Sequence, residues 1–505
     1  MPGSAPGGTA APAGQAARAV VIAAPASGSG KTTLATGLIG ALRRAGHRVA
    51  PFKVGPDYID PGYHGLAAGR PGRNLDPVLV GADRVAPLYR HGSAGCDLAI
   101  VEGVMGLFDG RIDEDDARPV AEGSTAQVAS LLGAPVVLVV DARGHSQSLA
   151  ALLHGFATFD SGIRLGGVIL NRVGSERHEH VLRAACARVG LPVLGALPRM
   201  AELEVPSRHL GLIPAVEHGS AATVAVAAMT DLVAAHVDLA AVAALARGTV
   251  SGPAWDPGGE IARAVAVSEA RAPGAAVRDA GVEAASAPGG FASPPAGEPL
   301  VAIAGGPAFT FGYAEHRELL AAAGARVEVF DPLRDELPAG TAGLVLPGGF
   351  PEEHAAALAA NTPLLAQVGA QAAAGLPIHA ECAGLLYLTR SLDGHALAGV
   401  VDADAEFGPR LTLGYRDAVA VADSPLWRAG ERVRGHEFHR TRLVRADTSR
   451  PAWGWRDPSG SAVREGLLSH RVHASYLHTH PAGNPVATAR FVAAAAAYAL
   501  AHAAR

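Results

Sequence analysis

The stretch VVIAAPASGSGKTT, residues 20–33, places an apolar, β-branched run before a glycine-rich turn, and a helical pattern follows it. This order predicts a phosphate-binding loop, because glycines let backbone N–H groups turn toward phosphate oxygens and the helix N-terminus adds its dipole. In such a loop Lys31 contacts the β- and γ-phosphates, and the Thr32 hydroxyl ligates Mg²⁺. Pro25 stands where the strict motif has its first glycine. The predicted ATP-binding residues of the loop are Gly28, Ser29, Gly30, Lys31, Thr32 and Thr33.

Around this loop, residues 19–247 alternate short apolar runs with helical stretches. The runs are continuously hydrophobic, which is typical of strands buried on both faces in a parallel sheet covered by helices. The sequence therefore predicts a doubly wound α/β domain over residues 19–247, preceded by a flexible tail at residues 1–18. The six runs read VVIAA, RVAPFK, DLAIVE, PVVLVVDA, GGVILN and LPVLGAL.

The alternation of apolar runs and helical stretches stops over residues 248–297. This segment is rich in Pro, Gly, Ala and Ser and is predicted to form a low-complexity linker. Apolar runs then start again and read LVAIAGG, ARVEVF, AGLVLPGGF and LPIHAECAG. We therefore expect a second α/β domain over residues 298–505. The predicted fold class is α/β, with two doubly wound domains.

Composition narrows the classes of partner. The 505 residues carry a formal net charge of −5, so no large basic field favours nucleic acid or acidic lipid. Three scattered cysteines form no CxxC pair and no disulfide framework. The apolar runs are much shorter than the ~20 residues of a membrane span, and the N-terminus does not read as a signal peptide. These features favour small-molecule substrates, no membrane and a cytoplasmic location.

Four acidic residues follow predicted strands near the phosphate loop. Glu102 ends the run DLAIVE, Asp109 follows in a glycine-rich loop, and Asp57 and Asp60 come after the second run. Carboxylates beside a triphosphate usually hold a cation, although each acid alone could be a solvated loop residue. We predict Thr32, Asp57 and Glu102 as metal ligands. Asn171, which ends the run GGVILN, is placed where its amide could bind adenine, although a turn asparagine would look the same.

The second domain contains a candidate nucleophile, Cys382, between the run LPIHAE and a helical stretch. A sharp strand-to-helix turn exposes such a residue, and the helix N-terminus favours its thiolate. Gly348 and Gly349 follow another run, and their backbone N–H groups are predicted to form an oxyanion hole. His478 in YLHTH is the predicted base, because YLHTH resembles the end of class I glutamine amidotransferases. These features predict a glutaminase.

The resemblance is incomplete at one position. Class I enzymes have a glutamate two residues after the base, where this chain has His480. Either a Cys–His dyad or a triad completed from elsewhere is therefore expected. His436 and His439 in GHEFHRT are expected to line the site or to be structural, without a chemical role.

An ordered set of motifs along nearly the whole chain resembles the a,c-diamide synthases of cobalamin biosynthesis. The motifs are GPDYIDPGYH, RNLDPVLVG, VEGVMGLFDG, RHLGLIP, LPGGFPEEH, ECAGLLYL, GHEFHRT and ASYLHTHP. The resemblance implies that a phosphate-loop synthetase domain uses ATP to phosphorylate a corrinoid acetate, and that ammonia from L-glutamine then attacks, at c and then at a. It implies a magnesium cofactor, and a homodimer is one assembly compatible with it. The implied synthetase-site residues are Asp57, Tyr58, Ile59, Asp60, Glu102 and Asp109.

Within this resemblance, APASGSGKTT, RPGRNLDPVLVG and YAEHRELL look most like the actinobacterial type, which acts on cobalt-free hydrogenobyrinate rather than on cobyrinate. A cobyric acid synthase or a nickel-sirohydrochlorin a,c-diamide synthase is the nearest alternative. An alternative of a different class is a partitioning-type ATPase switch fused to an inactive amidotransferase-like domain. Such switches commonly carry a second lysine early in the loop, where this chain has Pro25, Ala26 and Ser27.

Overall fold

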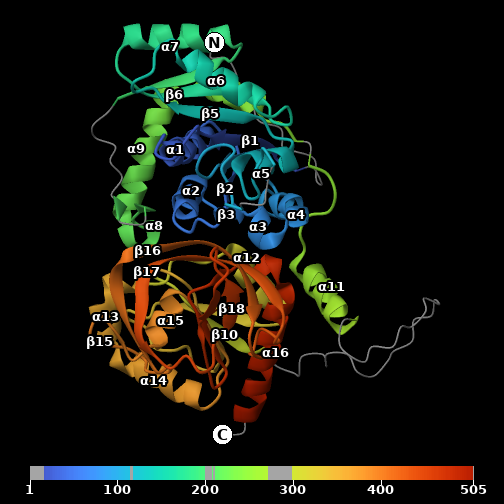
Figure 1. Ribbon diagram of the computed structural model, residues 1–505, viewed down its shortest axis with the longest axis vertical. Helices are drawn as coiled ribbons and strands as arrows, with labels where there is room; N and C mark the ends of the chain where they lie inside the picture. Colours follow the sequence, from blue (N-terminus) through green and yellow to red (C-terminus); the bar gives the residue numbers. More distant parts are fainter. Residues whose placement is uncertain are drawn as a thin grey trace, which may run out of the picture. The chain divides into compact units, whose positions relative to one another are not determined.

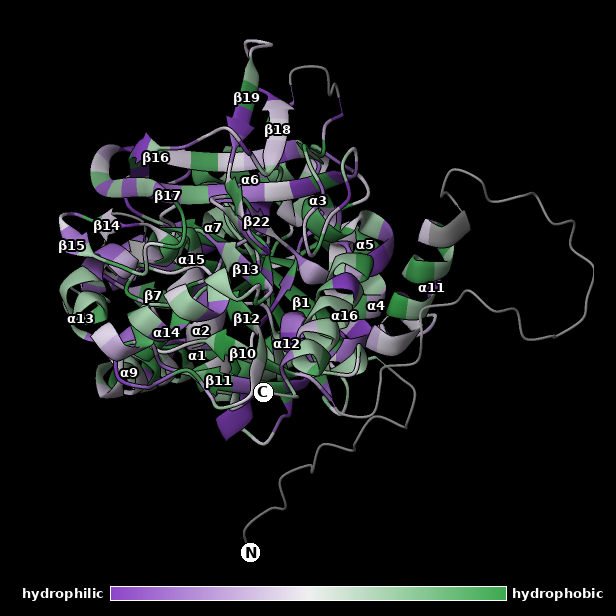
Figure 2. Cartoon of the chain, turned by 90° about the horizontal axis from the view of Figure 1, so that it is seen from below, coloured by the Kyte–Doolittle hydropathy of each residue, from purple (hydrophilic) through white to green (hydrophobic). Residues whose placement is uncertain are grey.

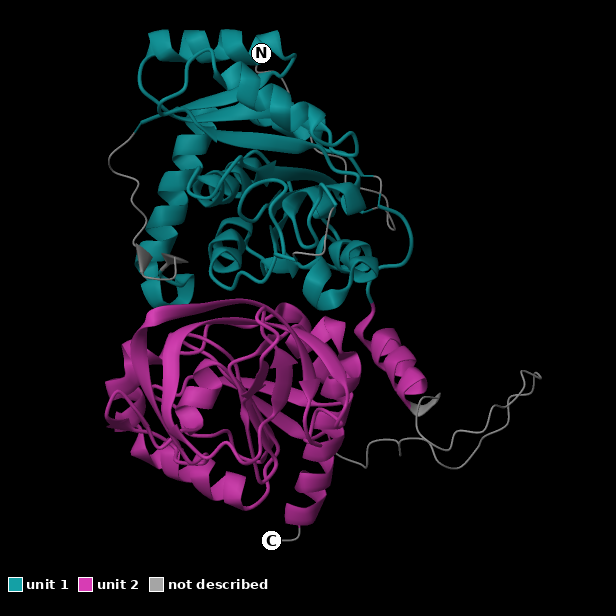
Figure 3. Cartoon of the chain, in the orientation of Figure 1, with its two compact units in different colours: residues 1–255 teal, residues 256–505 magenta. Residues whose placement is uncertain are grey.

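The computed structural model describes residues 16–113, 118–199, 207–208, 211–248, 250–270 and 298–503. The chain divides into two compact units, residues 1–255 and residues 256–505 (Figure 3). Each unit is an α/β structure with its own sheet (Figure 1). Most of the expected tail, residues 1–15, lies outside the described residues. The first strand begins at Arg18, one residue before the expected domain, and Ala17 before it is already buried.

Unit 1 contains a seven-stranded parallel sheet with the order β3-β2-β4-β1-β5-β6-β7. All six predicted runs form strands of this sheet, and the short β3 is the strand that was not anticipated. Their continuous hydrophobicity is explained by burial, since β2 and β4 are buried along their whole length. The strands are β1 (Arg18–Ala23), β2 (Val49–Val54), β3 (Arg73–Leu75), β4 (Leu98–Glu102), β5 (Val136–Asp141), β6 (Leu165–Val173) and β7 (Val193–Pro198).

Helices cover both faces of this sheet. The chain leaves β1 toward β2 in one direction and leaves β4 toward β5 in the other, so right-handed crossovers place α1 and α5 on opposite faces. Figure 1 shows α6 and α7 on one side of strands β5 and β6, and α1 on the other. The helices are α1 (Lys31–Arg44), α2 (Asp60–Ala68), α3 (Pro77–Val80), α4 (Ala82–Gly92), α5 (Thr125–Leu132), α6 (Leu149–Thr158), α7 (Glu176–Arg188), α8 (Ala215–His218), α9 (Ser220–His236) and α10 (Leu239–Leu245); a small hairpin joins β8 (Ser207–Arg208) and β9 (Gly211–Leu212).

Helix α1 packs closely against α9 because it carries glycine on the shared face. A Cβ atom on Gly37 would overlap the carbonyl oxygen of Met229, and one on Gly40 would overlap the Thr230 hydroxyl. The two helices therefore approach with backbone nearly in contact. This packing fixes the helix whose N-terminus carries the phosphate loop.

The stretch expected to be a linker is partly helical. Helix α11 (Pro257–Ala270) lies inside residues 248–297, and it packs against α12 and α16 of unit 2. Ala and Glu in the segment EIARAVAVSEA favour a helix, which the surrounding Pro and Gly obscured in the sequence. Residues 271–297 lie outside the described residues. Residues 257–270 of the predicted low-complexity linker therefore form a helix.

Unit 2 contains a six-stranded sheet with the order β11-β10-β12-β13-β21-β20, in which only β20 runs antiparallel to its neighbour. The four runs predicted in this half form β10 to β13. The strands are β10 (Leu300–Ala304), β11 (Arg326–Phe330), β12 (Thr341–Leu346), β13 (Ile378–Glu381), β20 (Leu467–Ser469) and β21 (Val472–Ser475). The helices are α12 (Ala314–Ala322), α13 (Ala355–Ala360), α14 (Thr362–Ala373), α15 (Ala383–Leu388) and α16 (Pro485–His502), with short 3₁₀ turns at Pro351–His354 and Pro481–Gly483.

A second, mainly antiparallel sheet in unit 2 was not predicted. Its long strands β16 and β17 alternate hydrophilic and hydrophobic residues, as Figure 2 shows, so they lack the continuous apolar runs that identified the other strands. Strand β17 pairs with β22, which carries the predicted base. The strands are β14 (Ser391–Leu392), β15 (His395–Ala396), β16 (Ala403–Ala420), β17 (Arg432–Ala446), β18 (Trp453–Arg456), β19 (Ala462–Glu465) and β22 (His478–Thr479).

No helix in the described part of the chain is long and apolar enough to cross a membrane.

Candidate active sites

The phosphate loop joins β1 to α1, as predicted. Gly28 and Gly30 have φ values of 78° and 94°, a left-handed conformation that favours glycine. The Lys31 ammonium donates to the Met105 carbonyl at 2.6 Å. Burial, followed by the charge of Lys53, lowers the pKa of Lys31 to about 8. The surroundings of Lys31 therefore disfavour its charged form relative to water.

Two residues at the end of β6 donate hydrogen bonds to the backbone of the phosphate loop. The Asn171 amide donates to the Ser29 carbonyl at 2.9 Å, and the Arg172 guanidinium donates to the Gly28 carbonyl at the same distance. Arg172 is also paired with Asp141 at 2.5 Å. Asn171 therefore lies directly beside the loop, and its amide N–H holds loop backbone. The sequence offered no signal for Arg172.

Three oxygen-bearing side chains meet at the carboxyl ends of β1, β4 and β2. The Thr32 hydroxyl lies 2.7 Å from Glu102 Oε1 and 3.1 Å from Asp60 Oδ2. These strands are neighbours in the sheet, and the crevice at such strand ends, where the winding direction changes, is where doubly wound folds bind ligands. A hydroxyl and two carboxylates are oxygen donors of the kind that Mg²⁺ prefers, usually together with substrate phosphates.

A buried lysine that the sequence interpretation missed lies between the carboxylates. The Lys53 ammonium is 2.7 Å from Asp60 Oδ2 and 2.8 Å from Glu102 Oε1. The His64 ring reaches the other Glu102 oxygen at 2.8 Å. Lys53 belongs to the run RVAPFK and His64 ends GPDYIDPGYH, so both were visible as polar residues within quoted motifs.

These contacts shift the pKa values in opposite directions. Burial lowers the pKa of Lys53, but attraction to Asp60 and Glu102 outweighs it and raises that pKa. Burial raises the pKa of Glu102, but Lys53 and His64 outweigh it and bring that pKa to about 2. For Asp60, burial and the neighbouring Asp57 dominate, and its pKa rises to about 7. Glu102 is therefore the firmly ionised member of the group.

The other predicted acids shape the loops around this group. One Asp57 oxygen accepts from the backbone N–H groups of Ile59 and Asp60, both at 2.9 Å. One Asp109 oxygen accepts from the Gly106 N–H at 3.0 Å. Asp57 and Asp109 thus arrange backbone, whereas Thr32 contacts Asp60 and Glu102 directly. Within the described ranges, no cluster of three or more His, Cys, Asp or Glu residues could hold a metal by itself. Of the remaining predicted residues, Tyr58 and Ile59 are buried and Thr33 is half-buried in the first turn of α1.

Cys382 lies at the turn between β13 and α15. Its φ of 48° and ψ of −98° are unusual for a residue with a side chain, and its N–H donates to the Ser475 carbonyl at 2.7 Å. Burial, followed by the charge of Glu352, raises the pKa of the thiol, whereas the backbone N–H groups of Ala383 and Gly349 oppose that rise. This is the geometry of a nucleophile elbow, with backbone donors at the sulfur.

Gly348 packs directly against His478, the predicted base, and Gly349 packs against backbone. A Cβ atom on Gly348 would overlap Cε1 of His478, and one on Gly349 would overlap the Ala308 carbonyl oxygen. Only glycine therefore fits at either position. The turn Gly348–Gly349 touches the His478 ring on one side and directs an N–H to the Cys382 sulfur on the other.

His478 is fully buried on β22, opposite His436 of β17. Burial lowers its pKa to about 4, and Glu381 opposes that shift. The Glu381 carboxylate lies 3.9 Å from Nδ1 of His478. A ring that stays neutral at pH 7 can accept a proton, as a base must.

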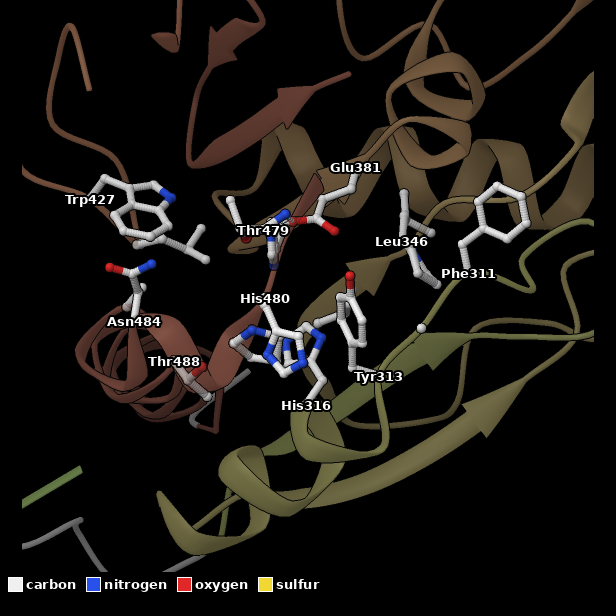
Figure 4. Close-up of a pocket in the computed structure, with 17 residues that line it drawn as sticks. Phe311, Tyr313, His316, Leu346, Glu381, Trp427, Thr479, His480, Asn484 and Thr488 are labelled. Carbon is white, nitrogen blue, oxygen red and sulfur yellow. Dashed lines mark hydrogen bonds and ion pairs between the residues drawn. The ribbon is translucent and has the colours of Figure 1, made fainter. Parts of the chain in front are cut away.

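His480 does not take the place of the missing glutamate. Its ring lies 4.0 Å from the Tyr313 ring, and its Nδ1 accepts from the Ala482 N–H at 3.2 Å. Figure 4 shows His480 beside Tyr313 and His316 in a cavity that Glu381 also lines. The histidine two residues after the base is therefore occupied in packing.

The two histidines of GHEFHRT differ in environment. His439 stacks on Tyr476 with the ring centroids 3.8 Å apart, and its Nδ1 contacts the Thr441 carbonyl at 2.8 Å. His436 lies beside His478, and burial followed by the charge of His478 lowers its pKa to about 3. His439 is thus packed in place, and His436 is a neutral neighbour of the base.

Known protein families match both halves of the chain. Residues 20–213 match the CobQ/CobB/MinD/ParA nucleotide binding domain, and residues 300–486 match the CobB/CobQ-like glutamine amidotransferase domain. The two sites described above lie within these two matched regions.

Curated relatives match nearly the full length. The hydrogenobyrinate a,c-diamide synthase of Mycobacterium tuberculosis H37Rv is 61% identical over 95% of this chain and 98% of its own. That of Streptomyces coelicolor is 56% identical over 96% of this chain and 99% of its own. The cobyrinate a,c-diamide synthase of Gloeobacter violaceus is 39% identical over 94% of this chain and 96% of its own. The resemblance found in the motifs is confirmed, and the chain belongs to the a,c-diamide synthase family.

Proposed function

We propose that this chain catalyses the ATP- and glutamine-dependent amidation of the a and c acetate carboxylates of hydrogenobyrinate. The observations that support the proposal are a phosphate loop whose Thr32 contacts Asp60 and Glu102, and a Gly348–Gly349 turn that touches His478 and directs an N–H to the Cys382 sulfur. Relatives named for hydrogenobyrinate reach 61% identity, against 39% for one named for cobyrinate, which favours the cobalt-free substrate.

In the first step, a carboxylate oxygen of the substrate attacks the γ-phosphorus of ATP, so that an acyl phosphate forms and ADP leaves. Lys31 and the loop N–H groups neutralise charge on the transferring phosphoryl group. Mg²⁺ would be held by Thr32 and Glu102, with Asp60 and Asp57 beside them, and would offset charge on the phosphates. Asn171, Tyr58, Ile59 and Asp109 are proposed to shape the nucleotide and substrate sites.

In the second step, ammonia attacks the acyl carbon and inorganic phosphate leaves, which gives the amide. The ammonia comes from glutamine, whose carboxamide carbon is attacked by the Cys382 sulfur. The N–H groups of Gly349 and Ala383 are aimed at the sulfur and are proposed, with Gly348, to hold the oxyanion. Water then hydrolyses the thioester and releases glutamate.

The test is a substrate panel. The full chain is incubated with ATP, Mg²⁺ and glutamine and with hydrogenobyrinate, cobyrinate or nickel-sirohydrochlorin, and the product mass and amidation sites are determined. We expect diamidation at a and c, fastest with hydrogenobyrinate. Amidation of peripheral propionates alone would indicate a cobyric acid synthase, and ATP hydrolysis without any amidation would indicate a switch.

For compartment and assembly, we propose the cytoplasm and a homodimer without nucleic acid. All three cysteines are free thiols, which suits a reducing compartment. Cell fractionation and light scattering on the purified chain test the two proposals. A secreted protein, or a mass equal to one chain, would refute them.

A further inference from the structure

The base of the glutaminase site lacks its usual acidic partner. A histidine base generally needs a carboxylate on its second nitrogen, which fixes the tautomer and stabilises the imidazolium that forms. In class I enzymes this acid follows the base by two residues, where this chain has His480. A histidine side chain carries no negative charge, and His480 is held against Tyr313 and accepts from the Ala482 N–H, so it does not replace the acid.

A carboxylate from a different strand occupies the required side of the base. Glu381 ends β13 immediately before the nucleophile, and its Oε2 lies 3.9 Å from Nδ1 of His478. Its Oε1 accepts from the backbone N–H and the hydroxyl of Thr479, at 3.0 and 2.8 Å. The carboxylate is thus anchored to the residue that follows the base. Figure 4 shows Glu381 pointing toward Thr479.

The Glu381 carboxylate also contacts a second histidine. Nε2 of His379 lies 3.3 Å from Glu381 Oε1. Burial would raise the pKa of Glu381, but contacts with His379, His478 and Thr479 outweigh it and bring that pKa to about 2. The group is therefore a half-buried acid that is ionised at neutral pH, beside an otherwise neutral base. The titratable groups that act on Glu381 or His478 are His316, His379, His473, Cys382, His436, Glu437 and His439.

The other acid near the base is already neutralised. Glu437 on β17 is paired with Arg416 at 2.6 Å and lies 3.7 Å from His439. Arg416 therefore largely offsets the charge of Glu437 and weakens its electrostatic effect on His478. The Glu381 carboxylate, by contrast, lies within ion-pair distance of the base.

We propose that Glu381 is the positioning residue of this glutaminase and takes over the role of the missing glutamate from the strand that precedes the nucleophile. The inference rests on the proposed glutamine hydrolysis. Nδ1–H of His478 faces Glu381, so Nε2 accepts the thiol proton as sulfur attacks the glutamine carbonyl. The imidazolium then returns that proton to the leaving nitrogen, and ammonia departs. The 3.9 Å separation is too long for a hydrogen bond and is expected to shorten when glutamine binds, as catalytic contacts often do.

The test compares Glu381→Gln with the wild-type full chain. Glutamine keeps the size and an acceptor for Thr479 but removes the charge. We expect kcat for glutamine hydrolysis to fall about 10²-fold, with the KM for glutamine changed less than about threefold. Because Glu381 raises the pKa of His478, the acid limb of the kcat/KM profile should move to lower pH in this variant. A merely structural residue would leave that limb in place.

Two further variants control for folding. Glu381→Asp keeps the charge on a side chain that is one methylene shorter. Its kcat should be about tenfold higher than that of Glu381→Gln. Glu465→Gln changes another half-buried glutamate of the same unit, one that accepts from Ser475 and Tyr476, and should keep kcat within about threefold. Ammonia-driven amidation should stay normal in all three.

Glu381→Gln with kcat within about threefold of wild type and an unmoved acid limb would overturn the inference. Equal losses in Glu381→Gln and Glu381→Asp, with no shift of the limb, would do the same. Failure of the proposed function has a different signature, since the wild-type chain would then hydrolyse glutamine yet amidate no corrinoid.

Discussion

The two buried lysines of unit 1 are predicted to affect stability by very different amounts when replaced by methionine. Lys53 lies between Asp60 and Glu102, and its pKa is raised above the ordinary value. Lys31 has a pKa lowered to about 8, because burial and Lys53 outweigh the nearby acids. A raised pKa means that folding favours the lysine's charge, and a lowered pKa means that folding disfavours it.

Removing one partner from a buried ion pair costs about 3–5 kcal/mol, because the other charge is left without compensation. Lys53→Met leaves two carboxylates in that situation, so unit 1 should lose about 3–5 kcal/mol of unfolding free energy at pH 8. A protein domain has only about 5–15 kcal/mol in total, so the loss is large. Lys31→Met should cost no more than about 0.5 kcal/mol, while it abolishes ATP-dependent amidation.

Hydrogen exchange with peptide-level mass spectrometry reports each unit separately, which a single melting curve of a two-unit chain does not. The slowest amides of β4 and β1 give the unfolding free energy of unit 1, and those of β13 serve as the internal reference. At pH 5 the penalty of Lys53→Met should shrink, because Asp60 is then protonated. Equal stability of the two variants, or a loss below about 1 kcal/mol for Lys53→Met, would refute the reasoning.

Three further outcomes are expected. Cys382→Ser should abolish glutamine hydrolysis but keep amidation when ammonium salt is supplied, and hydrolysis at the wild-type rate would exclude Cys382 as nucleophile. Gly348→Ala should lower the glutaminase rate about 10²–10³-fold, because its Cβ would displace His478, while amidation with ammonium persists; an unchanged rate would contradict the packing. The depressed pKa values of Glu102 and Glu381, both about 2, mean that the stability from their ionised forms is present above about pH 4.5 and is lost as pH falls toward 2. Because Glu102 loses its charge near pH 2, the unfolding free energies of Glu102→Gln and wild type should converge near that pH in acid titrations. Asp60, whose pKa is raised to about 7, destabilises the folded state as pH rises from about 4 to 7.

Much of the parallel-sheet framework could be predicted because its strands are buried on both faces. The phosphate loop and the Cys382 elbow were found for the same reason, since each follows such a strand. The paired strands β16 and β17 could not be found in this way, because their exposed and buried residues mix along the strand. Helix α11 was hidden by the Pro- and Gly-rich composition around it.

The residues that contact one another inside each site were harder to predict than the positions of the sites along the chain. Lys53 looked like part of an apolar strand, and its pairing with Asp60 and Glu102 depends on β2 and β4 being neighbours in the sheet and on α2 beginning beside them. Glu381 looked like a neighbour of the nucleophile, and its relation to His478 arises only because Thr479 of β22 donates to the carboxylate at the end of β13. Sequence spacing carries no information about such contacts between segments about a hundred residues apart.

Lys31 and Lys53 are the only two lysines among the 42 basic residues of the chain, and both lie at the proposed nucleotide site. Everywhere else positive charge is supplied by arginine, whose planar guanidinium is not a primary amine. Side-chain amine chemistry on this protein is therefore confined to one place. An acylating nucleotide analogue would meet no competing surface lysine, and Lys31, with a pKa near neutrality, offers the unprotonated amine that such reagents require. Labelling of Lys31 could therefore report nucleotide occupancy when it is read by the mass of the peptide that contains Lys31.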